Sequence, residues 1–281
     1  MPYERVDSSQ CHAELGLTGT TGTTITANGT PHNEGAWTQL DASTSIDADA
    51  IWLLINRPSA AMRGLLDIGI GASGQEVVLV DNFLIDTARA NCHGYHAWFP
   101  VPVPAASRLA ARIRASVGSV SVNVDVLLHR YGIPSDDYLR AVDTYGTDTT
   151  AGSGASSGTL DSGGSTVDPG ASINTRGAWK ELSSSIPNPI SWLLLSVGLN
   201  VNTAATTAAW VLSVATGAAS SEQVVATGYT LVANTTTDMV TPNTVLLPCA
   251  LPAGARLAVA AECTISDATD RLLQVAGYGF R

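Results

Sequence analysis

The chain has 281 residues, enough for two domains that each bury a core, and a formal net charge of −10 at pH 7. The chain has only 14 Lys and Arg residues. This composition excludes a nucleic-acid partner, because phosphate binding needs clustered basic side chains. The N-terminal MPYERVDSSQ has no apolar core, so we expect no signal peptide. No apolar run approaches the ~20 residues that span a membrane, so we expect no membrane insertion.

The first part of the chain predicts an extended arm followed by a β-domain. Residues 1–30 include the Thr-rich run TGTTGTTITANGT and are expected to form an N-terminal arm. Residues 31–132 contain short apolar or alternating runs, such as IWLLIN at 51–56. The run SVSVNVDVLL at 119–128 places valines on one face and polar residues mostly on the other, as in a half-buried strand.

The middle of the chain predicts a connection, and the last part predicts a second β-domain. Residues 133–170 are interpreted as a connecting segment, in which 133–145 could form a short helix and 146–166 a flexible linker rich in Gly, Ser and Thr. Residues 171–281 repeat the strand pattern of the first domain, with runs such as SWLLLSVGL and RLAVAAE. Short strands separated by Gly, Asn and Pro turns are typical of a sandwich or jelly roll.

An internal repeat relates the two domains. The offset between matching residues stays between 140 and 148, and the order of the matches is kept. The matched pairs are Trp37 with Trp179, Trp52 with Trp192, Glu76 with Glu222, Pro104 with Pro252, and Arg108 with Arg256. We therefore predict an all-β protein with two tandem jelly-roll-like β-sandwich domains that arose by internal duplication.

The stretch FPVPVPAASRLAARI at 99–113 shows how the repeat changes an interpretation. Taken alone, an arginine among prolines suggests a site, but LPCALPAGARLAVAA at 247–261 repeats the spacing. Proline lacks a backbone donor and is confined to the edges, starts and bulges of strands. We expect Pro100, Pro102 and Pro104 to form an edge segment and a turn before an inner strand that starts near Arg108.

Motifs for catalysis, cofactors and metals are missing from the sequence. There is no Gly-x-Ser-x-Gly elbow and no P-loop, and no Ser or Cys has a His and an acid at a familiar spacing. Cys92, His93 and His96 are the best metal candidate, but an exposed turn is the favoured interpretation. The four cysteines fit no zinc spacing and are expected to stay reduced: Cys11, Cys92, Cys249 and Cys263. We expect neither a bound metal nor a cofactor.

The repeated polar and aromatic residues are interpreted mainly as structural. Glu76 and Glu222 are expected to accept hydrogen bonds from turn backbone, although a catalytic acid is the alternative. Arg108 and Arg256 are expected on outward strand faces, or paired with these glutamates. The repeated tryptophans are expected in the cores, with sugar stacking as the alternative.

Tyr95 and Trp98 in GYHAWF form the aromatic cluster that we expect to be most exposed. Trp98 has no partner in the repeat, and Tyr95 and Trp98 are the candidate contacts for a host-surface glycan.

The runs GAWTQL, IWLLI, LLDIGIGASGQE and FPVPVPAASRLAARIRAS, with an alternating Val strand ending in YG, resemble a known family. It comprises β-sandwich structural proteins of tailed-bacteriophage and gene-transfer-agent particles. The resemblance is clearest over 35–132 and looser over 177–279. It implies a virion location, homo-oligomers that contact other virion proteins, and no catalysis. We expect a head-associated decoration or spike-base protein; the alternatives are a tail component, a glycan-binding module that recognises a receptor, and a glycan-degrading enzyme.

Overall fold

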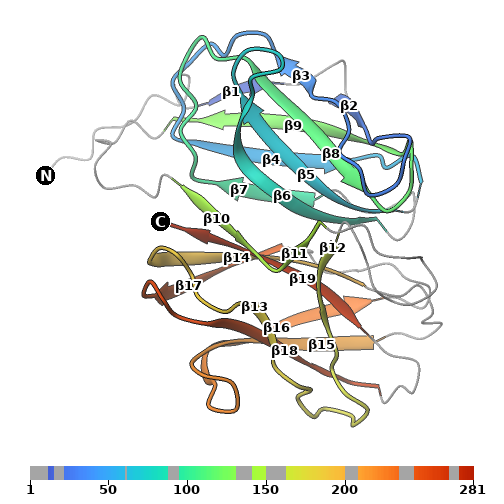
Figure 1. Ribbon diagram of the computed structural model, residues 1–281, viewed down its shortest axis with the longest axis vertical. Helices are drawn as coiled ribbons and strands as arrows, with labels where there is room; N and C mark the ends of the chain where they lie inside the picture. Colours follow the sequence, from blue (N-terminus) through green and yellow to red (C-terminus); the bar gives the residue numbers. More distant parts are fainter. Residues whose placement is uncertain are drawn as a thin grey trace, which may run out of the picture.

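The computed structural model describes residues 12–15, 22–60, 62–87, 95–130, 141–149, 163–199, 208–233, 244–265 and 272–281. Over these residues the chain forms β-strands and no helix, which confirms the all-β fold. Figure 1 shows two bodies, with the first nine strands in the upper body and the later strands in the lower one. No helix in the described ranges is long and apolar enough to cross a membrane.

The first body is a sandwich of two antiparallel sheets. Its strands are β1 (His12–Leu15), β2 (Thr23–Thr26), β3 (Thr38–Asp41), β4 (Ala50–Asn56), β5 (Met62–Ile70), β6 (Val77–Thr87), β7 (Tyr95–Phe99), β8 (Leu109–Ala115) and β9 (Ser121–His129). One sheet has the order β1–β9–β4–β7, with β2 also paired to β9, and the other has the order β3–β8–β5–β6. From β2 to β9 this is the strand order of an eight-stranded jelly roll.

The second body is a sandwich with the same strand order. Its strands are β10 (Val142–Tyr145), β11 (Thr147–Asp148), β12 (Gly163–Val167), β13 (Lys180–Ser183), β14 (Ile190–Leu199), β15 (Ala208–Thr216), β16 (Gln223–Ala233), β17 (Thr244–Leu251), β18 (Leu257–Cys263) and β19 (Leu273–Phe280). The sheets run β11–β12–β19–β14–β17, with β10 also on β19, and β13–β18–β15–β16. This common order is what a duplication predicts; the duplication itself stays a prediction.

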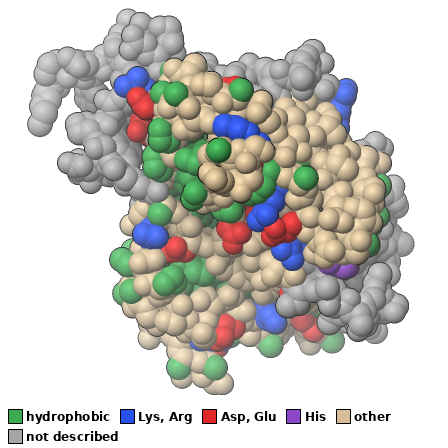
Figure 2. All heavy atoms as spheres, turned by 45° about the horizontal axis from the view of Figure 1, so that its top comes forward, with side chains coloured by type: hydrophobic (Ala, Val, Ile, Leu, Met, Phe, Trp, Pro, Cys, Tyr) green, Lys and Arg blue, Asp and Glu red, His purple; other side chains and the backbone are tan. Residues whose placement is uncertain are grey.

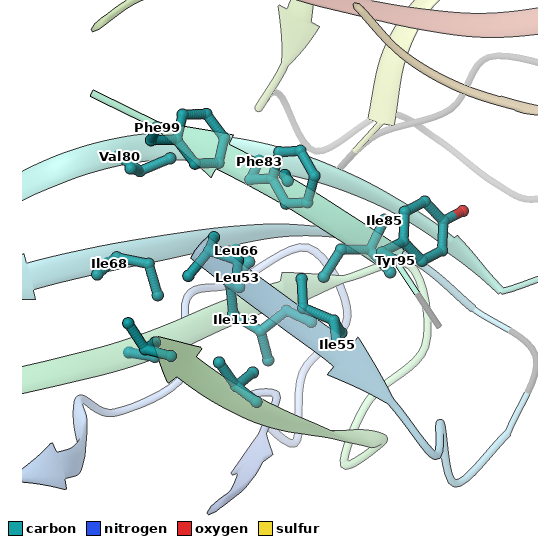
Figure 3. Packing of buried hydrophobic residues seen from close by; sticks show 14 of the residues in the cluster. Leu53, Ile55, Leu66, Ile68, Val80, Phe83, Ile85, Tyr95, Phe99 and Ile113 are labelled. Atoms are coloured by element: carbon teal, nitrogen blue, oxygen red, sulfur yellow. The ribbon is translucent and has the colours of Figure 1, made fainter. Parts of the chain in front are cut away.

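Alternating side chains build each core, because successive residues of a strand face opposite sides of the sheet. In β4, Leu53 and Ile55 point inward toward residues of β5 such as Leu66 and Ile68, and all four are buried. Figure 3 shows Leu53 and Ile55 facing the other sheet, in which Ile113 of β8 is the register partner of Leu66. The two hydrophobic faces pack together, and this packing holds the sheets in register.

The segments predicted as an arm and a linker contain strands. Thr23 to Thr26 of the predicted 1–30 arm pair with β9, and the predicted connection 133–170 contains β10, β11 and β12. The helix predicted for 133–145 is wrong at its end, because 142–145 form β10; residues 131–140 lie outside the described residues. Thr-rich segments favour strands once a sheet edge offers backbone partners, which composition alone does not reveal.

The proline-rich stretch lies where a missing backbone donor is tolerated. Pro100, Pro102 and Pro104 connect β7, the last strand of its sheet, with β8, an inner strand that begins at Leu109. Val103 between them exchanges backbone hydrogen bonds of 2.8 and 2.9 Å with Ala48. The predicted edge segment and the inner strand near Arg108 are therefore both present.

The two sandwiches meet along an apolar contact that we call the seam. It joins the β6–β7 edge of the first sandwich to the outward face of β14 and β19 in the second. Leu194, Ala276, Tyr278 and Phe280 belong to the same buried cluster as the core of the first sandwich. All eight residues of β19 are consequently buried, on both faces of the sheet.

Side chains of the second sandwich satisfy the exposed backbone edge of β6 at the seam. The Tyr278 hydroxyl accepts a hydrogen bond from the Leu84 N–H at 2.7 Å and donates to the Asn82 carbonyl at 2.8 Å. The Ser196 hydroxyl donates to the Leu84 carbonyl at 2.8 Å. Because unpaired edge groups are costly when buried, these bonds make the seam a specific contact between sandwiches.

A buried ion pair lies at one end of the seam. Arg63 Nε is 3.9 Å from Asp86 Oδ2 and donates to the Leu199 carbonyl at 3.2 Å. A Cβ on Gly198 would lie 2.4 Å from the Asp86 Cβ, so glycine is needed for β14 to approach. Burial raises the pKa of Asp86 to about 6, although the charge on Arg63 opposes the shift.

Candidate functional site

The repeated Arg and Glu residues form one arrangement in each sandwich, which we call the clamp. Arg108, just before β8, donates to Glu76 at 2.7 Å and to the Gly71 carbonyl at 3.2 Å. Its Nε donates to the Gln39 side chain at 3.3 Å. One guanidinium therefore joins the β5–β6 turn, β3 and the start of β8.

The second sandwich repeats the clamp with one change of partner. Arg256 donates to Glu222 at 3.1 Å, to the Gly217 carbonyl at 3.3 Å and to Glu181 at 2.7 Å. Glu181 occupies the place that Gln39 has in the first sandwich. The paired arrangement, rather than the outward-facing alternative, is therefore found for both arginines.

The clamp glutamates are held in their ionised form. Burial raises the pKa of Glu76, but backbone hydrogen bonds and Arg108 outweigh it, so the pKa lies below its usual value. Glu222 has a lowered pKa for the same reasons. A carboxylate fixed as an acceptor does not suit general acid catalysis, which needs a raised pKa.

We predict that Arg108→Met opens the β5–β6 turn locally. Amide exchange at residues 71–76 should accelerate by about tenfold, because the carboxylate and the turn carbonyl lose their donor. The pKa of Glu76 is lower in the folded protein than in the unfolded chain, so the clamp stabilises the folded protein fully at pH values above the unfolded pKa. This stabilisation is lost as the pH falls through the folded pKa. Hydrogen exchange with mass spectrometry measures this change. Arg256→Met is the matched control and should accelerate amide exchange only at residues 217–222. If both variants accelerated exchange equally in both turns, the prediction that each clamp acts only on its own turn would be wrong.

A charged network covers the outward face of the first sandwich. Arg112 donates to Asp67 at 2.8 Å and pairs closely with Glu34, which also pairs with Arg114 at 2.8 Å. The Arg112 guanidinium lies 4.5 Å from the centre of the Trp37 ring. In the sequence, the alternation of Arg112 and Arg114 along β8 is the signal for this network.

No single-sign patch dominates the face that Figure 2 displays, where acidic and basic side chains lie close together between apolar areas. Within the described ranges, no group of three His, Cys, Asp or Glu side chains could hold a metal. His96 is exposed on β7, whereas Cys92 and His93 lie outside the described residues. Cys249 and Cys263 are buried without a disulfide, and burial raises the pKa of Cys249 to about 11; Cys11 is not described.

The tryptophans expected in the cores are instead partly exposed. Trp52 and Trp192 are 38% and 39% exposed, on the outward faces of β4 and β14, so their core assignment is wrong. Alternation explains the result, because Ile51 and Leu53 point inward and Trp52 between them must point outward. Trp37 and Trp179 are half-buried, and each lies beside an arginine. Trp210, which has no partner in the repeat, is buried in the core of the second sandwich.

The candidate glycan contacts are less exposed than expected. Tyr95 is buried and its hydroxyl caps the β6 edge at Asp86, accepting from the backbone N–H at 2.7 Å and donating to the carbonyl. Figure 3 shows Tyr95 packed beside Ile85. Trp98 is half-buried at the seam, with its ring 5.8 Å from that of Phe280. Tyr95 is therefore a structural residue, and its expected exposure is wrong.

No protein-family model and no curated protein matches the chain. The crystal structure of PBSX exported protein XepA aligns with 99% of this chain and 89% of that chain, at 10% sequence identity and a TM-score of 0.24. The infectious bursal disease virus VP2 subviral particle aligns with 96% of this chain and 73% of that chain, at 12% identity and a TM-score of 0.17. Likenesses at these values assign neither a family nor an activity.

Proposed function

We propose that the chain is a non-enzymatic structural component of a tailed-phage virion, which associates with other virion proteins and with copies of itself. One observation carries this proposal: large apolar side chains stay exposed at equivalent places on both sandwiches. Trp52 and Trp192 form one such pair, and Val78 and Val224 are exposed at 37% and 45%. Exposed apolar groups in a shared pattern favour protein association over chemistry.

Within the virion, we propose a head-associated decoration or spike-base role. The sequence resemblance over 35–132 supports it. The seam also supports it, because two sandwiches joined by an apolar contact form a stiff block suited to a shell. The alternatives are a tail component and a glycan-binding module. For a glycan-binding module, the partly exposed Trp52 and Trp192 are better candidate sugar contacts than the buried Tyr95.

Antibody labelling of intact particles tests the proposed position. Native particles of the phage that encodes the chain, labelled with a gold-conjugated antibody to it, should carry gold on the head in electron micrographs. Particles lacking the protein are the control and should stay unlabelled. Gold confined to the tail tip would overturn the head assignment and favour the receptor-binding alternative.

A further inference from the structure

The end of the seam beside Gly198 buries two side-chain oxygens that lack a donor. One is Asp86 Oδ2 of the first sandwich and the other is Gln274 Oε1 of the second, and neither has a hydrogen-bond partner among the described residues. Asp86 is 6% exposed and Gln274 is fully buried. Because a buried acceptor without a donor is costly, two of them at one contact indicate a donor that both can use.

Strand register brings the two oxygens to the same place. Gly198 of β14 pairs directly with Gln274 of β19, so both residues present the same face of the sheet to the first sandwich. The Asp86 carboxyl lies on Gly198, where an added Cβ would be 2.4 Å from Oδ2. Directly opposite residues have Cβ positions about 5 Å apart, which a glutamine side chain can span. The carboxyl and the amide are therefore neighbours across the seam.

The donor side of the Gln274 amide is already engaged. Its Nε2 donates to the Thr166 hydroxyl at 3.0 Å, which leaves Oε1 as the atom available to a donor. An ionised Asp86 would only add a second acceptor, whereas a protonated carboxyl has one O–H to donate. A metal cation suits the place poorly, because Arg63 Nε already brings a positive charge to 3.9 Å from Oδ2. A proton on Asp86 is the donor that fits.

We propose that protonated Asp86 donates from Oδ2 to Gln274 Oε1, and that this hydrogen bond is a pH-sensitive latch between the two sandwiches. The proton comes from solvent as the pH falls and returns to solvent as the pH rises. Its loss leaves a buried negative charge facing an amide oxygen, so this end of the seam tightens in acid and loosens at neutral pH. The latch goes beyond the proposed virion role and does not depend on it.

The groups around Asp86 support this direction. Arg63, its register partner on β5, is the charged group that faces the carboxyl. Burial raises the pKa of Asp86 to about 6, against the opposing effects of Arg63 and the Leu199 N–H. The latch is therefore fully closed below the ordinary value of 3.8 and is lost as the pH rises through about 6. In the described part of the chain, the other groups that surround the carboxyl are neutral: the Tyr95 hydroxyl on β7, the Gln274 amide on β19 and the Thr166 hydroxyl on β12.

Infrared difference spectroscopy of the full-length chain tests whether the proton is shared. Spectra recorded between about pH 5 and pH 8 should contain a protonated-carboxyl band that disappears near pH 6 and that Asp86→Asn lacks. Gln274→Met removes the acceptor and should shift this band, whereas Gln75→Met, at an exposed turn position, is the matched control and should leave it in place. Identical spectra for wild type and Asp86→Asn, or a band that Gln274→Met leaves unmoved, would overturn the shared proton.

Hydrogen exchange with mass spectrometry tests whether the proton latches the seam. The ratio of amide exchange rates in wild type to those in Asp86→Asn cancels the pH dependence of chemical exchange. For residues 82–86 and 196–199, this ratio should be near one at about pH 5 and at least about tenfold higher at pH 8, because a pKa raised by roughly two allows a factor of up to about a hundred.

The turn at 217–222, in the second sandwich, is the internal control for this experiment and should keep its ratio at every pH. A seam ratio that stays constant would overturn the latch. A seam ratio that falls as the pH rises would also overturn it, because the ion pair with Arg63 would then hold the seam. Gold labelling of particles does not bear on either result, so failure of the latch and failure of the virion role are separate outcomes.

Discussion

Tyr278→Phe is expected to lower the free energy of unfolding by about 1–3 kcal/mol, because it leaves the buried Leu84 N–H without an acceptor. Tyr278→Ala should cost about 3–5 kcal/mol, since it also empties a space between Phe83 and Phe99. Urea denaturation followed by fluorescence measures both changes.

Tyr145→Phe is the matched control for the hydroxyl. Tyr145 is also buried, but its hydroxyl has no hydrogen-bond partner among the residues that the structure describes. Removing that hydroxyl should be neutral or stabilising, because it deletes an unsatisfied polar group. Equal losses in Tyr278→Phe and Tyr145→Phe would show that the seam hydrogen bonds add nothing to stability.

Asp86→Asn is expected to stabilise the protein increasingly as pH rises. The pKa of Asp86 in the folded protein is about 6, which lies above its ordinary value of 3.8. The protonated side chain therefore contributes its full stabilisation of the fold at pH values below 3.8. This stability is lost as pH rises through 6. The shift of roughly two units corresponds to about 3 kcal/mol. Asparagine resembles the protonated acid, so its advantage over wild type should grow by about that amount between pH 4 and pH 7.

Denaturation at a series of pH values measures this difference, and comparison with wild type cancels the other titrating groups. Asp81→Asn, at an exposed position of the same strand, is the control for replacing an aspartate of β6 by asparagine. An advantage of Asp86→Asn that shrinks as pH rises would show that the attraction to Arg63 outweighs the cost of burial.

Local sequence patterns could predict the fold and the clamp. The alternating valines of β9 and the prolines before β8 indicate strand faces and edges directly. Arg108 and Glu76 recur in the second half as Arg256 and Glu222, so pairing could be considered without a structure. The exposure of Trp52 was also within reach, because strict alternation from Ile51 and Leu53 places it outward. The general tendency of tryptophan to lie in cores does not hold for Trp52, because its place in the strand decides which way it points.

The seam could not be predicted in the same way. Its central hydrogen bond joins Leu84 and Tyr278, which lie 194 residues apart, and no local pattern connects them. One signal was present: β19 is apolar or small at nearly every position, whereas β9 alternates. A continuous run of this kind indicates a strand buried on both faces. The run LLQVAGY at 272–278 carries this signal, although it does not identify the element that covers its second face.

A low-resolution electron cryo-microscopy map of the intact particle tests the central claim most directly. The proposed function predicts head-associated density that fits the two stacked sandwiches as one block, with neighbouring blocks in contact. The same map from particles lacking the protein should have that density missing. Density only on the tail, or identical maps with and without the protein, would contradict the head-associated role.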